Sequence, residues 1–135
     1  MNKKSPTEVV TDFIHAWAES WDSLLQSFKD TLADDCVYAN SGLPTWQGKE
    51  LILQTLEQIH LQVGLERIVA DQLTIVAEGC RVVVERKEQW FDTNSDAIFE
   101  EQEGVLGLFE VKNSKIVGFR DYFDPRGMLA LMDNA

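Results

Sequence analysis

The sequence is poor in cysteine and in basic residues, and it has no long apolar stretch. Its 2 cysteines, Cys36 and Cys80, form neither a CxxC pair nor a disulfide-dense pattern, and no histidines stand near them at zinc-site spacing. No segment approaches the ~20 apolar residues of a membrane span, and the N-terminal segment lacks an apolar signal region. We therefore expect a cytoplasmic protein with reduced cysteines and no bound metal.

The charge balance is strongly acidic. With 12 Lys and Arg against 23 Asp and Glu, the formal net charge of −11 would repel phosphate backbones and anionic lipid surfaces, so we expect no nucleic acid and no membrane partner. The hydrophobic fraction of 44%, with 4 Trp and 7 Phe, is that of a globular protein. At 135 residues the chain is long enough for one packed core, and we predict a single domain over residues 1–135.

Two helices are predicted at the start of the chain. Ser5-Pro6-Thr7-Glu8 has the pattern of a capping box with proline at the first helical position. Apolar residues follow at helical spacing up to Trp17 and Trp21, which we expect in the core. Asp22 can cap a short second helix.

A short strand, a loop and a third helix are predicted next. The strand covers residues 36–40 and the loop covers residues 41–47. The third helix runs from Gly48 to about Gly64, and its apolar face is expected to hold Leu51, Ile52, Leu56 and Ile59.

From Leu65 onward the apolar pattern changes from a helical period to a period of two. Four extended segments are predicted, over residues 65–77, 81–91, 98–111 and 115–123, before a short helix that begins at Asp124-Pro125. The acidic run 100–103 is expected to be a solvated strand edge or turn. Helices followed by consecutive strands indicate an α+β fold in which a curled antiparallel sheet wraps over the helices.

The strand over residues 81–91 places two charged residues on an apolar face. Alternation puts Arg86 and Glu88 on the same side as Val82, Val84 and Trp90, whereas the opposite side has a solvated pattern. Burying charges is unfavourable unless they pair. We therefore expect this strand to direct an arginine and a carboxyl group into the interior.

Two other strands repeat this pattern. Asp121 is the only polar member of a face that also holds Val117, Phe119 and Phe123, and in the first strand Cys36, Tyr38 and Asn40 share a face. These polar groups are expected to meet in one interior. A plain buried ion pair between Arg86 and Asp121, or a charged residue near a strand end, is the alternative interpretation.

The strands also resemble those of a known family. Residues 105–109 and 115–124, with Tyr38-Ala39-Asn40 and Glu85-Arg86-Lys87-Glu88, resemble the limonene-1,2-epoxide hydrolase family over almost the whole chain. That family belongs to a wider group of cone-shaped folds that includes nuclear transport factor 2 (NTF2) and the SnoaL-like polyketide cyclases. The resemblance implies an NTF2-like fold with a curled mixed or antiparallel sheet, three N-terminal helices and an internal pocket. It also implies a homodimer.

The resemblance implies a catalytic set. In the family a Tyr, an Asn and an Asp hold a water molecule, an Arg bridges that Asp to a second Asp, and the second Asp protonates the epoxide. Carried over residue by residue, Tyr38, Asn40 and Asp121 would hold the water. Arg86 would bridge to the acid, which would be Glu88.

Two positions depart from the family pattern. Glu88 replaces the acidic Asp, and Phe119 stands where the family tends to have Trp. The extra methylene would move the acid by about one carbon–carbon bond, and a shift of ~1 Å can cost ~100-fold in rate.

The implied reaction adds water to a small hydrophobic epoxide and gives a vicinal diol. Ionised Asp121 would take a proton from water while protonated Glu88 gives one to the ring oxygen, so that no cofactor is required. The apolar lining of the pocket is expected to come from Trp46, Trp90, Phe109, Phe119, Leu43 and Met128.

Two other functions fit the same residues. In an isomerase or cyclase, Asp121 would remove a proton from a carbon acid without needing Glu88 and Tyr38 together. A non-catalytic protein that binds a small apolar ligand, or a regulatory dimer module, would need neither acid nor base. The replacement of the family Asp by Glu88 favours these alternatives.

Overall fold

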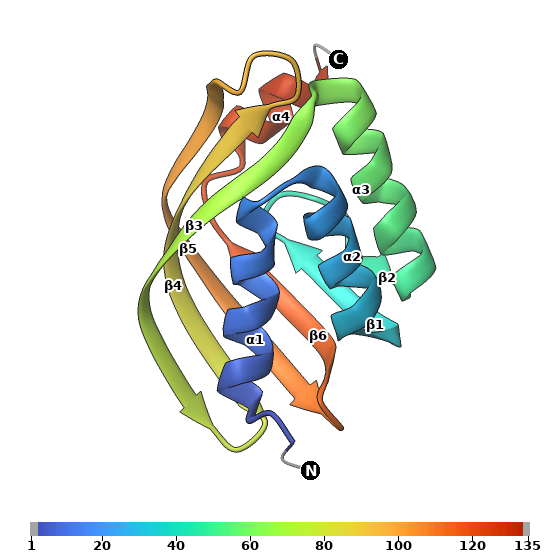
Figure 1. The fold of residues 1–135 in the computed structure, drawn as a ribbon, viewed down its shortest axis with the longest axis vertical. Coiled ribbons are helices and arrows are strands. Elements are labelled where there is room, and N and C mark those ends of the chain that lie inside the picture. Colours follow the sequence, from blue (N-terminus) through green and yellow to red (C-terminus); the bar gives the residue numbers. More distant parts are fainter. Residues whose placement is uncertain (1–2, 134–135) are drawn as a thin grey trace.

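The computed structural model describes residues 3–133 and has a six-stranded sheet that curls around the N-terminal helices (Figure 1). The helices are α1 (Pro6–His15), a 3-10 turn η1 (Ala16–Ala18), α2 (Trp21–Thr31), α3 (Lys49–Val63) and α4 (Arg126–Asp133). The strands are β1 (Leu32–Asn40), β2 (Trp46–Gln47), β3 (Leu65–Glu78), β4 (Arg81–Asp92), β5 (Ile98–Lys112) and β6 (Lys115–Tyr122). The predicted α+β class is confirmed, and the four long strands begin at the residues predicted for them.

The sheet is mixed rather than antiparallel. Its strand order is β2-β1-β6-β5-β4-β3, and β1 pairs with β6 in parallel while the other neighbouring pairs are antiparallel. This pairing joins an early strand to the last one, so the alternation pattern of the separate strands could not indicate its direction. Its register places Tyr38 beside Phe119 and Asn40 beside Asp121.

Side chains that cap the first turn determine where the first two helices begin. The Ser5 side chain accepts from the backbone N–H of Glu8 at 3.1 Å and Glu8 accepts from that of Ser5 at 3.0 Å, which confirms the predicted capping box. The second helix begins two residues earlier than predicted, because Ser20 rather than Asp22 is its N-cap and accepts from the N–H of Ser23 at 3.1 Å.

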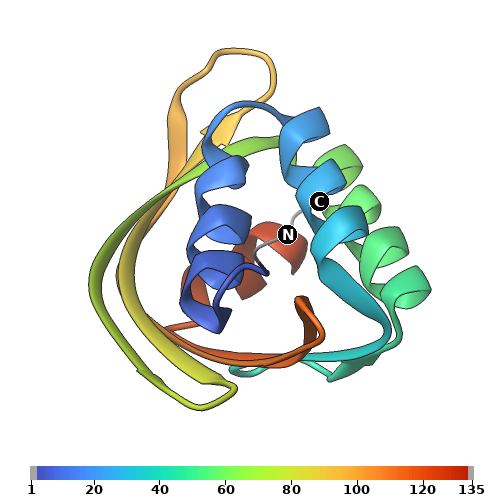
Figure 2. The same ribbon diagram turned by 60° about the horizontal axis from the view of Figure 1, so that its bottom comes forward.

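Helices α1 and α2 pack inside the curve of the sheet (Figure 2). The predicted apolar face of α3 is correct for Ile52, Leu56 and Ile59, but Leu51 is exposed because it lies on the outer side of the helix. In β6, Ile116 is fully buried while Val117 is only half-buried. A register irregularity beside Val111 interrupts the alternation there.

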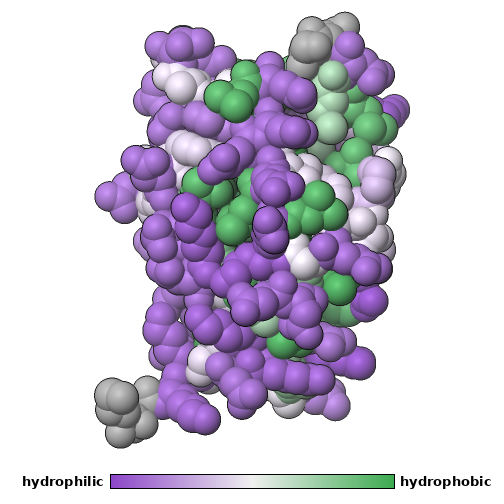
Figure 3. Space-filling model, turned by 90° about the vertical axis from the view of Figure 1, so that its right-hand side faces the viewer, coloured by the Kyte–Doolittle hydropathy of each residue, from purple (hydrophilic) through white to green (hydrophobic). Residues whose placement is uncertain are grey.

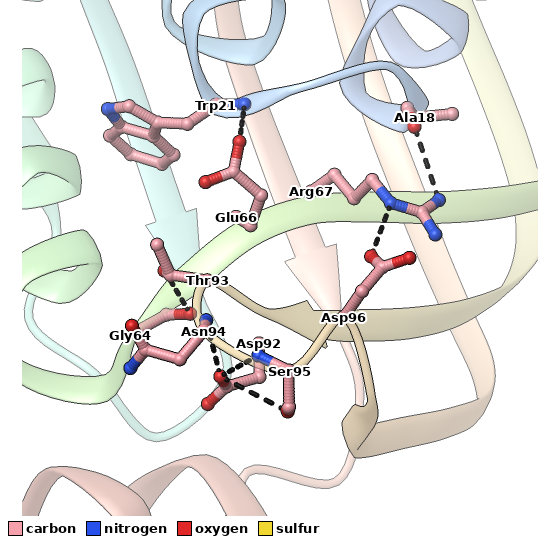
Figure 4. Close-up of polar contacts among 10 residues, drawn as sticks. All are labelled: Ala18, Trp21, Gly64, Glu66, Arg67, Asp92, Thr93, Asn94, Ser95 and Asp96. Atoms are coloured by element: carbon pink, nitrogen blue, oxygen red, sulfur yellow. Dashed lines mark hydrogen bonds and ion pairs between the residues drawn. The ribbon is translucent and has the colours of Figure 1, made fainter.

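The turn between β4 and β5 is held at the same end of the molecule as the start of α2 (Figure 4). Asp92 accepts from the backbone N–H groups of Asn94 and Ser95, and these hydrogen bonds lower the pKa of its carboxyl group. Arg67 donates to Asp96 at 3.2 Å and to the carbonyl of Ala18 at 3.3 Å. The turn is therefore tied to β3 and to the short η1 segment.

The outer side of α3 is mostly hydrophilic, with separate apolar areas (Figure 3). Leu51 and Leu61 of α3 are 44% and 81% exposed. Within residues 3–133, no helix is both long and apolar enough to cross a membrane.

Candidate active site

Arg86 and Glu88 lie on the concave side of the sheet and are almost fully buried. Alternation along β4 directs both side chains inward together with Val82, Val84 and Trp90, all of them buried, as predicted. Arg86 donates from Nε to Glu88 Oε2 at 2.7 Å and from Nη2 to Asp121 Oδ2 at 2.8 Å. The guanidinium group thus bridges the two carboxyl groups.

The first strand brings a phenol and an amide to the same place. The parallel pairing of β1 with β6 aligns Asn40 with Asp121, and the Tyr38 hydroxyl donates to Asp121 Oδ2 at 3.1 Å. Asn40 is half-buried and lines the same cavity as these side chains. All five polar residues predicted from the sequence therefore lie around one cavity.

The burial of this cluster shifts two of its pKa values. Burial alone would lower the pKa of Arg86, but the charges and hydrogen bonds of Asp121 and Glu88 outweigh it and raise that pKa above its usual value. Burial, reinforced by the Asp121 charge, raises the pKa of Tyr38 well above its usual value. Arg86 thus stays cationic and Tyr38 stays a hydrogen-bond donor over the neutral range.

The cavity has a volume of about 50 Å³, more than the ~10–15 Å³ that one water molecule requires. Among the residues expected to line it, Trp46, Trp90 and Met128 do so. Three others lie outside its wall: Phe109, Phe119 and Leu43. Most of the rest of the wall is apolar, and it also includes Leu24, Phe28, Leu56, Ile59, Leu65, Ile68, Val105 and Phe123.

Phe109 and Phe119 are buried behind the site instead. Phe119 stacks on Tyr38 with ring centroids 3.8 Å apart, and Phe109 in turn stacks on Phe119 at 5.3 Å. The two rings therefore support the Tyr38 ring from behind. Leu43 packs against the core from the loop that follows β1.

Gly107 contributes to the site although it has no side chain, and the pattern of polar residues in the sequence does not indicate it. It lies on β5 between Val84 of β4 and Asp121 of β6. A Cβ atom at this position would come within 2.6 Å of Arg86 Nη1 and 2.9 Å of Asp121 Oδ1. A glycine inside a strand indicates close approach of other atoms, and Gly107 here makes room for the ion pair.

Gln102 and Trp17 also line the cavity, although the sequence predicted neither of them there. Gln102 is 7% exposed and donates to the Asp124 carbonyl at 3.1 Å, so this part of the acidic run is not solvated. A register shift between β4 and β5 beside Gln102 reverses the face that simple alternation assigns to it. Trp17 is buried as expected, and the Arg86 guanidinium lies over its ring at 5.4 Å.

Ser41, which follows β1, forms hydrogen bonds with the backbone on both sides of Tyr122. Its backbone N–H and its hydroxyl both donate to the Asp121 carbonyl, at 3.0 and 3.3 Å, and the hydroxyl accepts from the N–H of Phe123 at 3.2 Å. The backbone around Asp121 is thereby fixed to the end of β1. Among residues 3–133, no three His, Cys, Asp or Glu side chains are grouped so that they could hold a metal ion.

The model of the limonene-1,2-epoxide hydrolase catalytic domain matches residues 4–133. The chain belongs to this family. A solved structure of an LEH-like epoxide hydrolase of M. tuberculosis is 26% identical, with 96% of this chain and 91% of that chain covered and a TM-score of 0.69. The predicted resemblance to the limonene-1,2-epoxide hydrolase family is therefore confirmed.

More distant structures share the fold of this epoxide hydrolase family member. An NTF2-like protein of unknown function from Burkholderia pseudomallei is 17% identical, with 96% of this chain and 98% of that chain covered and a TM-score of 0.73. A protein with a ketosteroid isomerase-like fold from Catenulispora acidiphila, solved in complex with trimethylamine, is 19% identical, with coverages of 92% and 91% and a TM-score of 0.68. The predicted NTF2-like fold is confirmed, and these two similarities extend to the fold alone.

Proposed function

We propose that this chain adds water to a small hydrophobic epoxide and releases a vicinal diol. The observation that supports the proposal is the buried chain of hydrogen bonds from Tyr38 through Asp121 and Arg86 to Glu88, on the wall of an apolar cavity. Opening an epoxide needs a base for the attacking water and an acid for the leaving oxygen. Two carboxyl groups in opposite protonation states supply both.

In the proposed reaction Asp121 is ionised and Glu88 carries a proton. A water molecule oriented by Asn40 and Tyr38 attacks a ring carbon and gives its proton to Asp121. The carbon–oxygen bond of the ring breaks, and its oxygen takes the proton of Glu88. One negative charge thus moves from Asp121 to Glu88, and Arg86 donates a hydrogen bond to the carboxyl group at each end of that movement.

The test is diol formation from a panel of cyclic and aryl epoxides, comparing the wild-type chain with Asp121→Asn. We expect the wild type to form diol and Asp121→Asn to lose at least ~1,000-fold in rate while its circular dichroism is unchanged, because the amide cannot accept the proton. Asp71→Asn is the matched control, since Asp71 is an exposed carboxylate on β3. Unchanged turnover by Asp121→Asn would exclude the assignment of the base.

A second candidate is proton transfer at carbon, as in an isomerase or cyclase. Both Glu88 oxygens accept from N–H donors, at 2.7 Å from Arg86 and 3.0 Å from Trp90, an arrangement that also suits a carboxylate that never carries a proton. In that case Asp121 alone would be required. Turnover of an enolisable ketone that survives Glu88→Gln, without diol formation from any epoxide, would favour this reaction. Saturable binding with no turnover of either substrate would favour a ligand-binding protein.

A further inference from the structure

Three consecutive inward positions of β4 form one hydrogen-bonded unit. Arg86 Nε donates to Glu88 Oε2 at 2.7 Å, and Trp90 Nε1 donates to Glu88 Oε1 at 3.0 Å. Glu88 is 5% exposed and Trp90 is 7% exposed, and both line the cavity. Each carboxyl oxygen of Glu88 therefore has its own donor, one from the residue two positions before it and one from the residue two positions after it.

A glutamate needs this second donor more than an aspartate would. Its carboxyl group lies one carbon–carbon bond farther from the strand, ~1.5 Å, and has one more rotatable bond to order. Arg86 alone fixes one oxygen and leaves the carboxyl plane free to turn. The Trp90 indole fixes the other oxygen, and the ring is itself packed edge-on against Phe99 with centroids 6.3 Å apart.

The two donors are not equivalent. The Arg86 donor is charged and 2.7 Å from Oε2, whereas the indole is neutral and 3.0 Å from Oε1. A protonated carboxyl group keeps the stronger donor on its unprotonated oxygen, so in the proposed reaction the proton of Glu88 would lie on Oε1. An indole N–H only donates, and its bond to Oε1 strengthens as the proton leaves. An interaction that strengthens as the reaction proceeds accelerates it.

We propose that Trp90 is a positioning residue that places Glu88 Oε1 for proton delivery and stabilises the carboxylate that remains. The inference rests on the proposed function of Glu88 as the acid. In this step the Glu88 O–H bond breaks and its proton goes to the epoxide oxygen as the ring carbon–oxygen bond opens. The electron pair of the O–H bond stays on Oε1, opposite the Trp90 N–H. Trp90 would thus compensate for the longer side chain of Glu88, compared with the Asp of the family pattern.

The first test is the pH–rate profile of Trp90→Phe, which keeps an aromatic ring but removes the N–H. We expect kcat to fall ~10- to 100-fold with a smaller change in KM, because the lost contact strengthens during the reaction. The alkaline limb of the profile should move to higher pH, because the carboxylate form of the proposed acid has lost a hydrogen-bond donor. Trp46→Phe removes another indole N–H from the same cavity wall and should leave the alkaline limb in place. A Trp90→Phe limb that coincides with the wild-type limb overturns the positioning role.

The second test does not depend on turnover. The chain has 4 tryptophans, so the indole N–H signal of Trp90 in a ¹⁵N-tryptophan-labelled sample can be assigned by its loss in Trp90→Phe. We expect Glu88→Asp to shift this signal upfield and speed its hydrogen exchange, because the shorter carboxyl group withdraws from the indole. Glu85→Asp, on the outer face of the same strand, should do neither.

The outcomes separate the two proposals. Absence of diol formation by the wild type over the whole epoxide panel overturns the proposed function. Diol formation together with a Trp90 indole N–H signal that is unchanged in Glu88→Asp overturns the positioning role but not the proposed function. Diol formation, a Glu88-dependent Trp90 signal and a displaced alkaline limb in Trp90→Phe support both.

Discussion

Single residues of the site are held by more than one partner. Asp121 Oδ2 accepts from Tyr38 at 3.1 Å and from Arg86 at 2.8 Å, while its backbone carbonyl accepts from Ser41. Catalytic groups fixed in this way need little reorganisation during a reaction. The charged members of this set could be predicted from the sequence, because a charged residue on an apolar strand face is buried only where it has a partner. Gly107 could not, since its contribution is the absence of a side chain.

Gly107→Ala should strongly lower the rate of diol formation, while its loss of stability should be moderate. The added methyl group would meet Arg86 Nη1 at 2.6 Å and Asp121 Oδ1 at 2.9 Å, and overpacking of this kind costs ~1–3 kcal/mol of stability. A displacement of the carboxyl group by ~1 Å would lower diol formation ~100-fold. Gly104→Ala is the matched control on the same strand, since its added methyl group meets no atom within 4 Å. Equal activity of the two variants would contradict the role of Gly107.

Tyr38 should remain protonated in the folded protein at alkaline pH. Its pKa is raised by burial and by Asp121, whereas an unfolded tyrosine ionises at pH ~10. Stability from this group is therefore complete below pH ~10 and is lost as the pH rises from there through the folded-state pKa. The 295-nm absorbance of a Tyr122→Phe variant should rise only as the protein unfolds. A rise at pH ~10 with unchanged circular dichroism would contradict the buried hydrogen bond.

At the level of the strands, alternation predicted which side chains are buried wherever the strand pairing is regular. In β4 the predicted inward and outward faces are correct from Val82 to Trp90. In β5 a register shift buries Gln102, and a second irregularity between β5 and β6 buries Ile116 in place of Val117. Bulges depend on how two strands pair, so a period of two in one strand cannot locate them. Alternation also cannot show that β1 and β6 pair in parallel, because strand direction depends on which strands become neighbours.

The start of α2 should depend on a residue of β3. Glu66 accepts from the backbone N–H of Trp21 at 2.9 Å, next to the Ser20 cap (Figure 4). A carboxylate at a helix N-terminus satisfies a free N–H group and favours the helix dipole. Glu66→Ala should lower the free energy of unfolding in urea by ~0.5–2 kcal/mol. Glu57→Ala, an exposed residue in the middle of α3, should change it by less than ~0.5 kcal/mol, and equal effects would contradict the capping role.

At the level of the whole molecule, the outer face of the sheet carries exposed apolar side chains. Leu106 and Tyr122 lie opposite each other on β5 and β6 and are 47% and 52% exposed. Val37 on β1 is 38% exposed and Val76 on β3 is 59% exposed. We propose that this face joins two copies of the chain in the homodimer that the family resemblance implies.

Light scattering after size-exclusion chromatography should therefore give the mass of a dimer. Leu106→Glu should give a monomer, because a carboxylate would be buried at the contact. Leu61→Glu, which changes an 81% exposed leucine of α3, should remain a dimer. A monomeric wild type at all concentrations would contradict the proposed interface.

In the proposed reaction, water attacks the epoxide directly with Asp121 as its base. The most direct test is a single turnover in H₂¹⁸O with enzyme in excess over an epoxide that the wild type converts, followed by mass spectrometry of the diol. Direct attack predicts one ¹⁸O atom in every diol molecule from the first turnover, and Asp121→Asn should form no diol on the time scale of the wild-type turnover. An unlabelled first-turnover diol would contradict direct attack, because the new oxygen would then have come from a carboxyl group of the protein through a covalent ester.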